Sequence, residues 1–231
     1  IKKPFLNKKN LKHFAFIPAR EFSKGLPMKN RILLSYTLDF IKKLTWIKKT
    51  YIFSDDKFLK KKINRYKDID FIHRKRSESY GNESIKSVFK NFLNKIDYDN
   101  NSIFWLFYLT IPQRKLIHFN KARNLIDNDK VNSIISFIDI KTHPFDCWIV
   151  KNNKIKQKLF KHDSFRRQDK PLFYEHHHYI CALSPRTINK INSELISEET
   201  YPFILEESFS KNLIEIDTKN DLKNFQKINI K

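Results

Sequence analysis

The sequence predicts an α/β protein whose sheet is mostly parallel and is covered by helices on both faces. Short apolar runs alternate with longer segments in which apolar residues recur at the helical period. The run 103–109, Ile-Phe-Trp-Leu-Phe-Tyr-Leu, is apolar throughout, which is typical of a central strand buried on both sides. A length of 231 residues suits one domain of this class, so we treat 1–231 as a single domain.

The predicted strands and helices follow one another along most of the chain. Strands are expected at 13–17, 50–54, 70–73, 103–109, 131–138, 147–150, 179–183 and 213–218. Helices are expected at 33–44, 58–66, 83–96, 118–126, 185–195 and 219–228. The segment 141–170 breaks the alternation and is expected to form an excursion from the main body.

The composition is strongly basic, with 46 Lys+Arg against 25 Asp+Glu and a formal net charge of +21. Such a charge fits a polyanionic partner, either a nucleic acid or a nucleotide. The lysines are scattered through predicted helices and do not gather beside an aromatic platform, which favours compositional bias over a nucleic-acid face. The two cysteines fit a reducing cytoplasm, and the lack of a run of about 18 apolar residues predicts no membrane span.

The loop after the first predicted strand is a candidate phosphate site. Residues 13–17 form an apolar run that ends at Pro18, and a helical pattern resumes at 33. The start of a helix offers free N–H groups and a positive dipole end, to which anions bind. The intervening loop carries three cations, Arg20, Lys24 and Lys29. A plain turn with solvated lysines explains this local pattern equally well.

Gly25 lies in the middle of that loop, in a chain that has only 2 glycines. We therefore expect a side chain to be excluded at this position. The cause would be either a positive φ or a group that lies close to the backbone.

Two acidic pairs are candidates for binding a metal. Asp55 and Asp56 follow the predicted strand 50–54, but a helix N-cap explains them better than metal binding. Glu215 and Asp217 are two residues apart on the predicted strand 213–218, so their carboxylates should share one face. They form either a soluble edge strand or a seat for a divalent metal.

Three consecutive histidines, 176–178, suggest zinc at first sight. Neighbours on a strand point to opposite faces, so all three cannot bind one ion. Because no Cys or carboxylate lies at ligand spacing, we give a metal at this place little weight.

The first loop also carries a family signature. Residues 19–30, Ala-Arg-x-x-Ser-Lys-Gly-x-Pro-x-Lys-Asn, closely resemble the first motif of the acylneuraminate cytidylyltransferases, the CMP-sialic acid synthetase family. Weaker elements follow in family order over about 14–222: Thr110-x-Pro112-x-Arg114, Arg166-Arg167-Gln168-Asp169-x-Pro171, and Glu215-x-Asp217-Thr218. The chain departs from the family at Ile111, Gln113 and Glu215, and at His177-His178, where many members carry Asn-Gly near the acceptor sugar.

The resemblance implies a nucleotide-diphospho-sugar transferase fold, which is Rossmann-like, and a homodimer assembled through 141–176. It implies the reaction of CTP with a sialic-acid-like (nonulosonic) sugar acid, giving a CMP-sugar and pyrophosphate, with Mg²⁺ as cofactor. The alternatives are a non-enzymatic nucleic-acid-binding protein, or a cytidylyltransferase-like protein with another acceptor or no activity.

The resemblance also assigns roles to residues of four loops, 18–30, 74–84, 110–114 and 214–218, which should converge on one crevice. The catalytic candidates are Lys24, Arg20 and Asp217. The nucleotide-binding candidates are Arg20, Ser23, Lys24, Gly25, Lys29, Asn30, Arg74 and Ser84. The candidates for binding the acceptor are Arg114, Arg167, Gln168 and His177, and the candidates for binding the metal are Asp217 and Glu215.

Overall fold

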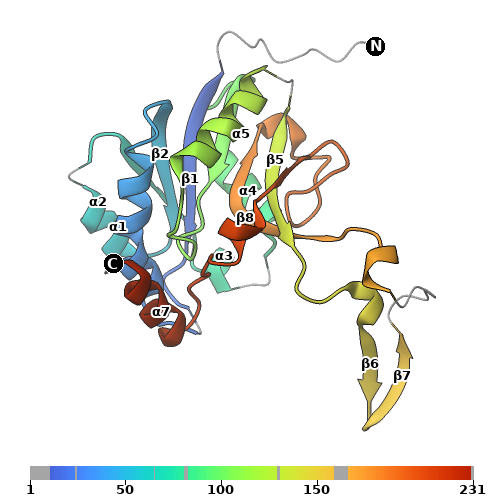
Figure 1. Cartoon of the computed structure of the whole chain (residues 1–231). Helices are drawn as coiled ribbons and strands as arrows, with labels where there is room; N and C mark the ends of the chain where they lie inside the picture. The colour runs from blue at the N-terminus through green and yellow to red at the C-terminus, as the bar shows by residue number, and fades with distance from the viewer. Residues whose placement is uncertain are drawn as a thin grey trace.

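The computed structural model describes residues 11–23, 25–64, 66–80, 83–128, 131–158 and 166–229. They form a seven-stranded sheet in the order β3-β2-β1-β4-β8-β5-β9 and a separate two-stranded hairpin, β6-β7 (Figure 1). The strands are β1 (Lys12–Ala19), β2 (Ile47–Ser54), β3 (Ile69–His73), β4 (Ser102–Leu106), β5 (Ser133–Asp139), β6 (Trp148–Lys151), β7 (Lys154–Lys158), β8 (Tyr174–Leu183) and β9 (Tyr201–Ile204). The α-helices are α1 (Lys29–Ile41), α2 (Lys57–Ile63), α3 (Ser77–Tyr80), α4 (Ile85–Leu93), α5 (Leu116–Asn128), α6 (Glu207–Ser210) and α7 (Lys219–Asn229).

The sheet is mostly parallel, as the sequence predicts. Strand β1 pairs in parallel with β2 and β4, β2 with β3, and β5 with β9. Only β8 runs against its neighbours, β4 and β5. The chain builds outward from β1 to β3 and then crosses back to place β4 on the other side of β1. Such a reversal opens a crevice at the carboxyl ends of the two strands, and ligands of α/β sheets bind there.

Helices cover both faces of the sheet, and the side chains of β1 alternate between them. Ala15 and Ile17 are fully buried in a core with residues of α1, α2, α5 and α7. Phe16 faces the other way, into a core with α4, where its ring lies 4.4 Å from that of Phe92. Because both faces of β1 are buried, its position is fixed, and so is the loop that leaves its end.

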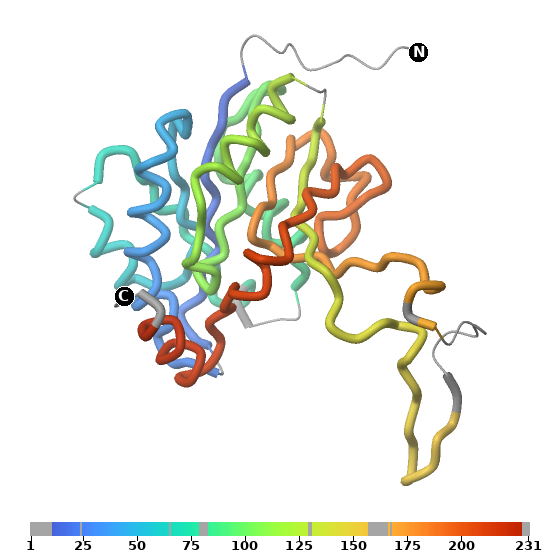
Figure 2. Tube along the Cα trace, viewed as in Figure 1, coloured from blue at the N-terminus to red at the C-terminus, as the bar shows by residue number. Residues whose placement is uncertain are grey.

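The C-terminal helix returns to the beginning of the chain. Figure 2 shows α7 beside the blue N-terminal elements. The ring of Phe225 on α7 meets that of Tyr36 on α1 edge to face, with centroids 5.2 Å apart. The segment before α7 is thereby placed beside the first loop.

The hairpin β6-β7 stands away from the main body (Figure 1). Its turn is formed by Asn152 and Asn153, whose φ angles of 52° and 57° suit a tight hairpin turn. Trp148, Val150 and Ile155 on the hairpin are 55%, 64% and 70% exposed. The hairpin belongs to the segment 141–176, for which the sequence predicts a dimer contact.

Two predicted elements are wrong. The expected helix 185–195 is a single 3₁₀ turn, Pro185–Thr187, followed by turns. The Asn192 side chain accepts hydrogen bonds from the N–H groups of Glu194 and Ile196, which closes a tight turn where the helix was expected. The expected strand 213–218 forms no ladder: the N–H of Ile216 donates to the main-chain oxygen of Thr110, and that of Ile214 donates to the Gln113 side chain.

Among the described residues, no helix has the length and apolar character needed to span a bilayer.

Candidate active site

A cavity of about 380 Å³ opens at the carboxyl ends of β1 and β4. Residues from all four of the predicted loops line it. The charged and polar residues that matter most are Arg20, Lys29, Arg74, Ser84, Glu215 and Asp217. Asn30 and Thr110 also contribute.

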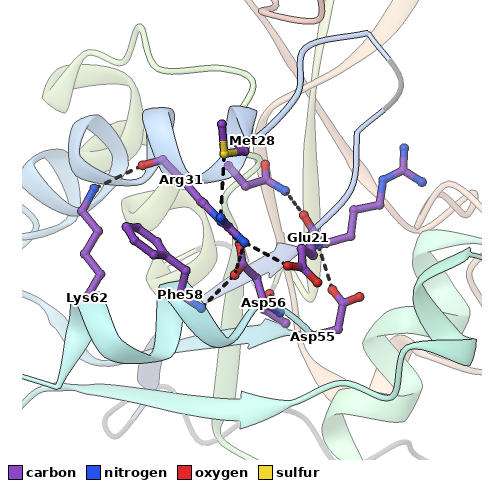
Figure 3. Close-up of polar contacts among 10 residues, drawn as sticks. Glu21, Met28, Arg31, Asp55, Asp56, Phe58 and Lys62 are labelled. Carbon is purple, nitrogen blue, oxygen red and sulfur yellow. Dashed lines mark hydrogen bonds and ion pairs between the residues drawn. The ribbon is translucent and has the colours of Figure 1, made fainter.

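Side chains of α1 hold the beginning of the first loop. Asn30 Nδ2 donates to the main-chain oxygen of Arg20 at 2.8 Å. Arg31 donates to both carboxylate oxygens of Asp56, at 2.7 and 3.0 Å, and to Glu21 at 2.9 Å (Figure 3). The Glu21 N–H in turn donates to Asp55 at 2.9 Å. These bonds set the point from which the exposed Arg20 side chain reaches the cavity.

The same contacts settle the role of Asp56. Its carboxylate is 1% exposed, is paired with Arg31 and accepts the Phe58 N–H at 2.8 Å as the N-cap of α2. The capping interpretation is therefore confirmed. Asp55 also has a structural contact, although its Oδ2 is buried with no hydrogen-bond partner among the described residues.

Gly25 lies against the last of the four loops. Its φ is not positive, so the first of the two expected causes does not apply. A Cβ at this position would overlap the main-chain oxygen of Asp217 and lie 3.4 Å from its carbonyl carbon. The second cause, a close neighbour, is confirmed, and the neighbour is backbone of the chain itself.

The segment 213–218 keeps the expected alternation although it is not a strand. Ile216 is fully buried, and its N–H donates to the main-chain oxygen of Thr110 at 2.8 Å. Glu215 and Asp217, on either side, both line the cavity. Glu215 accepts the Thr110 hydroxyl at 3.2 Å, and Asp217 pairs with Lys29 Nζ at 2.5 Å. Partial desolvation and then the nearby Asp217 raise the pKa of Glu215.

Arg74 is the most enclosed cation of the cavity, with 7% of its surface exposed. It donates to the Glu78 carbonyl and lies 3.6 Å from Glu83. Burial lowers its pKa, and its Nε has no hydrogen-bond partner in the part of the chain that the structure describes. A buried guanidinium at a cavity wall is well placed to bind an anionic group of a ligand.

Ser84 lies at the start of α4, at the edge of the cavity. It lines the cavity, and its hydroxyl accepts the Ser87 N–H at 3.2 Å as the N-cap of α4.

Several predicted site residues do not line this cavity. Arg114 donates inward to the Thr37 hydroxyl and the Tyr108 carbonyl, at 3.1 and 2.7 Å, and desolvation lowers its pKa to about 9. Gln168 is exposed on a 3₁₀ turn (Arg167–Asp169), and His177 Nδ1 accepts the Tyr179 N–H at 3.1 Å. Ser23 and Gly25 also lie off the lining. Lys24 and the side chain of Arg167 lie outside the described residues.

Two polar residues of the lining, Tyr108 and Glu194, lie outside the four predicted loops. Tyr108 is two residues before the motif residue Thr110, so the end of the apolar run could have pointed to it. Burial raises its pKa, and its ring lies 4.8 Å from that of His178. Glu194 comes from a turn that carries no local signal.

The strand order is that of a nucleotide-diphospho-sugar transferase fold. Cations and carboxylates line the cavity at the switch point of its sheet. The solved structure of CMP:2-keto-3-deoxy-manno-octonic acid synthetase complexed with CTP matches with a TM-score of 0.66 at 13% identity, over 94% of this chain and 98% of that one. The 2-C-methyl-D-erythritol 4-phosphate cytidylyltransferase of Francisella tularensis matches with a TM-score of 0.64 at 14% identity, over 93% and 98%. These matches confirm the predicted fold.

The sequence is homologous to the N-acylneuraminate cytidylyltransferases, which confirms the resemblance carried by its motifs. The protein from Streptococcus agalactiae serotype V is 28% identical over 220 residues, which cover 91% of this chain and 52% of the relative. The protein from serotype III gives the same values. This chain thus spans about half the length of the curated relatives it matches. No protein-family model matches the chain.

Proposed function

We propose that this chain is a cytidylyltransferase that transfers CMP from CTP to a nonulosonic acid, releasing pyrophosphate. The observation that carries the proposal is the meeting of Arg20, Lys29 and Arg74 with Glu215 and Asp217 around one cavity. This combination suits a triphosphate, whose charge needs cations on the protein and a metal beside it. The match to a synthetase solved with CTP and the homology to acylneuraminate enzymes support the choice of nucleotide and acceptor.

In the proposed reaction the anomeric hydroxyl of the sugar acid attacks the α-phosphorus of CTP. A bond forms from that oxygen to phosphorus, the bond from phosphorus to the bridging β-phosphate oxygen breaks, and the proton of the hydroxyl is released to solvent. Little covalent chemistry is left to the protein, so positioning and charge neutralisation carry the catalysis. Arg20 and Lys29 hold the triphosphate, and Asn30, Arg74 and Ser84 hold the nucleoside side.

Lys24 is the proposed partner of the leaving pyrophosphate. The assignment rests on the Ser23-Lys24-Gly25 motif, because Lys24 is not among the described residues. Two described residues on either side of it in the sequence line the cavity: Arg20 before it, and Lys29 after it at the start of α1.

The donor set at Glu215 and Asp217 fits magnesium. Mg²⁺ prefers oxygen ligands and binds through one or two carboxylates together with substrate phosphates. Both carboxylates face the cavity, and Asp217 forms an ion pair with Lys29. A bound metal would compete with Lys29 for Asp217, and a bound phosphate would compete with Asp217 for Lys29. When bound, the ion neutralises phosphate oxygens and helps to activate the attacking hydroxyl.

The acceptor side is assigned from residues of the family motifs. Arg167 and Gln168 remain proposals for binding the sugar acid, in which an arginine suits the carboxylate. His177-His178 stands where relatives carry Asn-Gly, so we propose that the acceptor differs from the common sialic acid. We also propose that the protein works as a homodimer assembled through 141–176.

The test is a turnover assay of the full chain with CTP, Mg²⁺ and a panel of nonulosonic acids, in which pyrophosphate and the CMP-sugar are both measured. We expect release of pyrophosphate with at least one acid, loss of the signal with EDTA, and little signal with UTP or ATP. If CTP binds but no acid is turned over, the proposed acceptor is wrong. If CTP does not bind in the presence of Mg²⁺, the proposed function is wrong.

A further inference from the structure

The outer two of the three consecutive histidines meet a carboxylate from another part of the chain. His176 Nε2 and His178 Nε2 lie 3.8 and 3.6 Å from Glu194 Oε2. The ligand atoms of these three residues all lie within 4.8 Å of one another. We propose that His176, His178 and Glu194 form a binding site for a transition-metal ion of the zinc class, separate from the proposed magnesium site.

The strand β8 is shaped so that these histidines can converge. Ile135 of β5 pairs with Cys181, but the next residue, Ser136, pairs with His177, so residues 178–180 form a bulge. The Ser136 hydroxyl fills the gap by accepting the Ile180 N–H at 2.9 Å. Bulges of this kind redirect side chains. The imidazole rings of His176 and His178 stand edge to face with centroids 5.2 Å apart.

His177 takes no part in this cluster. It lies between the two other histidines on β8, and its Nδ1 accepts the Tyr179 N–H. The expectation that three neighbouring histidines cannot share one ion therefore holds. The carboxylate that the sequence analysis did not find at ligand spacing is that of Glu194, in the turn that follows β8.

That turn is rigidly built. Asn192 closes it by accepting the N–H groups of Glu194 and Ile196, at 2.9 and 3.0 Å. Leu195 has a left-handed φ of 66° although it is not a glycine, and it is 2% exposed. A strained backbone persists only where its surroundings hold it, and such strain gathers at ligand sites. The Glu194 carboxylate is thus presented to β8 from a fixed position.

The spacing of the ligand atoms is close to that of a metal site. Tetrahedral zinc holds nitrogen and oxygen ligands at about 2.0–2.2 Å, which puts neighbouring ligand atoms roughly 3.3–3.5 Å apart. The two nitrogen-to-oxygen separations of 3.6 and 3.8 Å need to shorten by only a few tenths of an ångström. Two imidazoles with one carboxylate are a recurrent donor set for zinc, whereas Mg²⁺ prefers oxygen alone.

The protein itself does not satisfy the ring of His178. Its Nδ1 is buried and finds no hydrogen-bond partner within the described ranges. Unpartnered buried nitrogens are uncommon and call for a further group. A flip of the ring about the Cβ–Cγ bond exchanges Nδ1 with Cδ2 and Nε2 with Cε1, so it changes the partners that both nitrogens can reach.

The site lies at the wall of the cavity. Glu194 is one of the lining residues, and the ring of Tyr108, another lining residue, packs on that of His178. Three protein ligands leave a coordination position for water or for an oxygen of a bound molecule. The ion would also tie the turn 192–196 to β8. This proposal does not depend on the cytidylyltransferase activity.

The test uses the full chain after removal of metals with a chelator. It is titrated with Zn²⁺ in excess Mg²⁺, which occupies the all-oxygen site, and binding is followed by calorimetry and by the rise in melting temperature. We expect one strong site. Loss of a directly bound ligand in His178→Ala or Glu194→Gln should weaken zinc binding by on the order of a hundredfold or more. Co²⁺ should give visible absorption bands in the wild type and not in these two variants.

The matched control is His177→Ala, which removes a histidine from the same strand but not from the cluster. Cys147→Ser controls for a thiol site. Both should bind zinc as the wild type does. The proposal is overturned if the wild type binds no zinc at micromolar concentration, or if binding survives Glu194→Gln, a half-exposed position where the substitution leaves the fold intact. Equal loss in His177→Ala would also overturn it.

Discussion

A side chain on Gly25 would collide with the main-chain oxygen of Asp217, so the first loop of the chain and the last meet backbone to backbone. The contact links the phosphate-loop candidate to the metal candidate. The ion pair between Lys29 and Asp217, at 2.5 Å, joins the same two segments a few residues away. We therefore regard the two loops as one structural unit.

Gly25→Ala should disturb this unit without unfolding the protein. The new methyl group must displace the Asp217 backbone, and with it the carboxylate that faces the cavity. A misplacement of about 1 Å lowers turnover on the order of a hundredfold, and Gly25→Val should be worse. Turnover and CTP affinity with Mg²⁺ give the result, and a thermal melt checks the fold. Wild-type kinetics in Gly25→Ala would show that the contact between Gly25 and Asp217 has no part in catalysis.

Asp217→Asn should raise the Mg²⁺ concentration needed for half-maximal rate. The change removes a charge that faces the cavity and also the partner of Lys29. Glu215→Asp should be mild, because it restores the aspartate of the family motif that residues 215–218 resemble, and Glu215→Ala should lie between the two. The measurement is a magnesium titration at saturating CTP.

Glu207→Gln, an exposed acid on α6, is the control for that titration. It should titrate as the wild type does. Should Asp217→Asn also do so, the carboxylates have no part in metal binding. Asp56 is then no substitute, because Arg31 and the cap of α2 already use its oxygens.

Lys24→Ala should lower turnover by a factor on the order of a hundred or more, as the loss of a charge partner of the transition state does. Lys60→Ala, an exposed lysine on α2, is the control and should be neutral. The KM for CTP should change less than kcat, because the charge on the leaving pyrophosphate develops during the reaction. A rate within twofold of wild type would remove Lys24 from the mechanism.

The sequence predicts the site well where strand ends decide it. Arg20, Arg74 and Thr110 each follow a strand of the parallel half of the sheet, and parallel strands bring their carboxyl ends to one edge. The apolar runs predict where these strands lie. The convergence of the loops at the ends of these strands can therefore be predicted as well.

The features that the sequence does not predict depend on contacts between distant segments. An extended segment and a strand share the period of two, so Glu215 and Asp217 could be placed on one side but their backbone pairing could not be predicted. The turn that replaces the expected helix 185–195 depends on one side chain, Asn192, whose hydrogen bonds compete with helix formation. Glu194 reaches the histidines only because of that turn.

Ile155→Asp on the β6-β7 hairpin should dissociate the proposed dimer. The hairpin stands apart from the body and exposes apolar side chains that a second copy would cover. A charge in the centre of such an interface is costly, so the variant should sediment as a monomer. The measurement is analytical ultracentrifugation over a range of concentrations.

Ile117→Asp on α5 is the matched control, because both isoleucines are 70% exposed but only Ile155 lies on the hairpin. It should leave the oligomeric state unchanged. A wild type that is monomeric at all concentrations, or a dimer that survives Ile155→Asp, would rule out this interface.

A hydrogen-bonded chain under the sheet should give the protein a pH-dependent share of its stability. The Trp105 indole N–H donates to His13 Nδ1 at 3.0 Å, and His13 Nε2 lies 3.0 Å from Asp127. Arg123 donates to the other carboxylate oxygen at 3.0 Å. Burial alone would raise the pKa of Asp127, but the hydrogen bond from His13 and the charge and hydrogen bond of Arg123 outweigh it, so the pKa is lowered.

Asp127→Asn should therefore destabilise the protein at neutral pH and much less in acid. A carboxylate whose pKa is lower in the folded state stabilises the fold above its unfolded pKa of about 4, and this contribution disappears as the pH falls through the folded value. The loss of hydrogen bonds to a charged group should cost about 1.5–3 kcal/mol at pH 7. Urea unfolding of wild type and variant at pH 7, 5 and 3.5 measures the difference. Asp39→Asn, which removes an exposed partner of Lys42, is the control and should show no such pH dependence. A difference between wild type and Asp127→Asn that is the same at pH 7 and 3.5 would show that the effect comes from packing and not from charge.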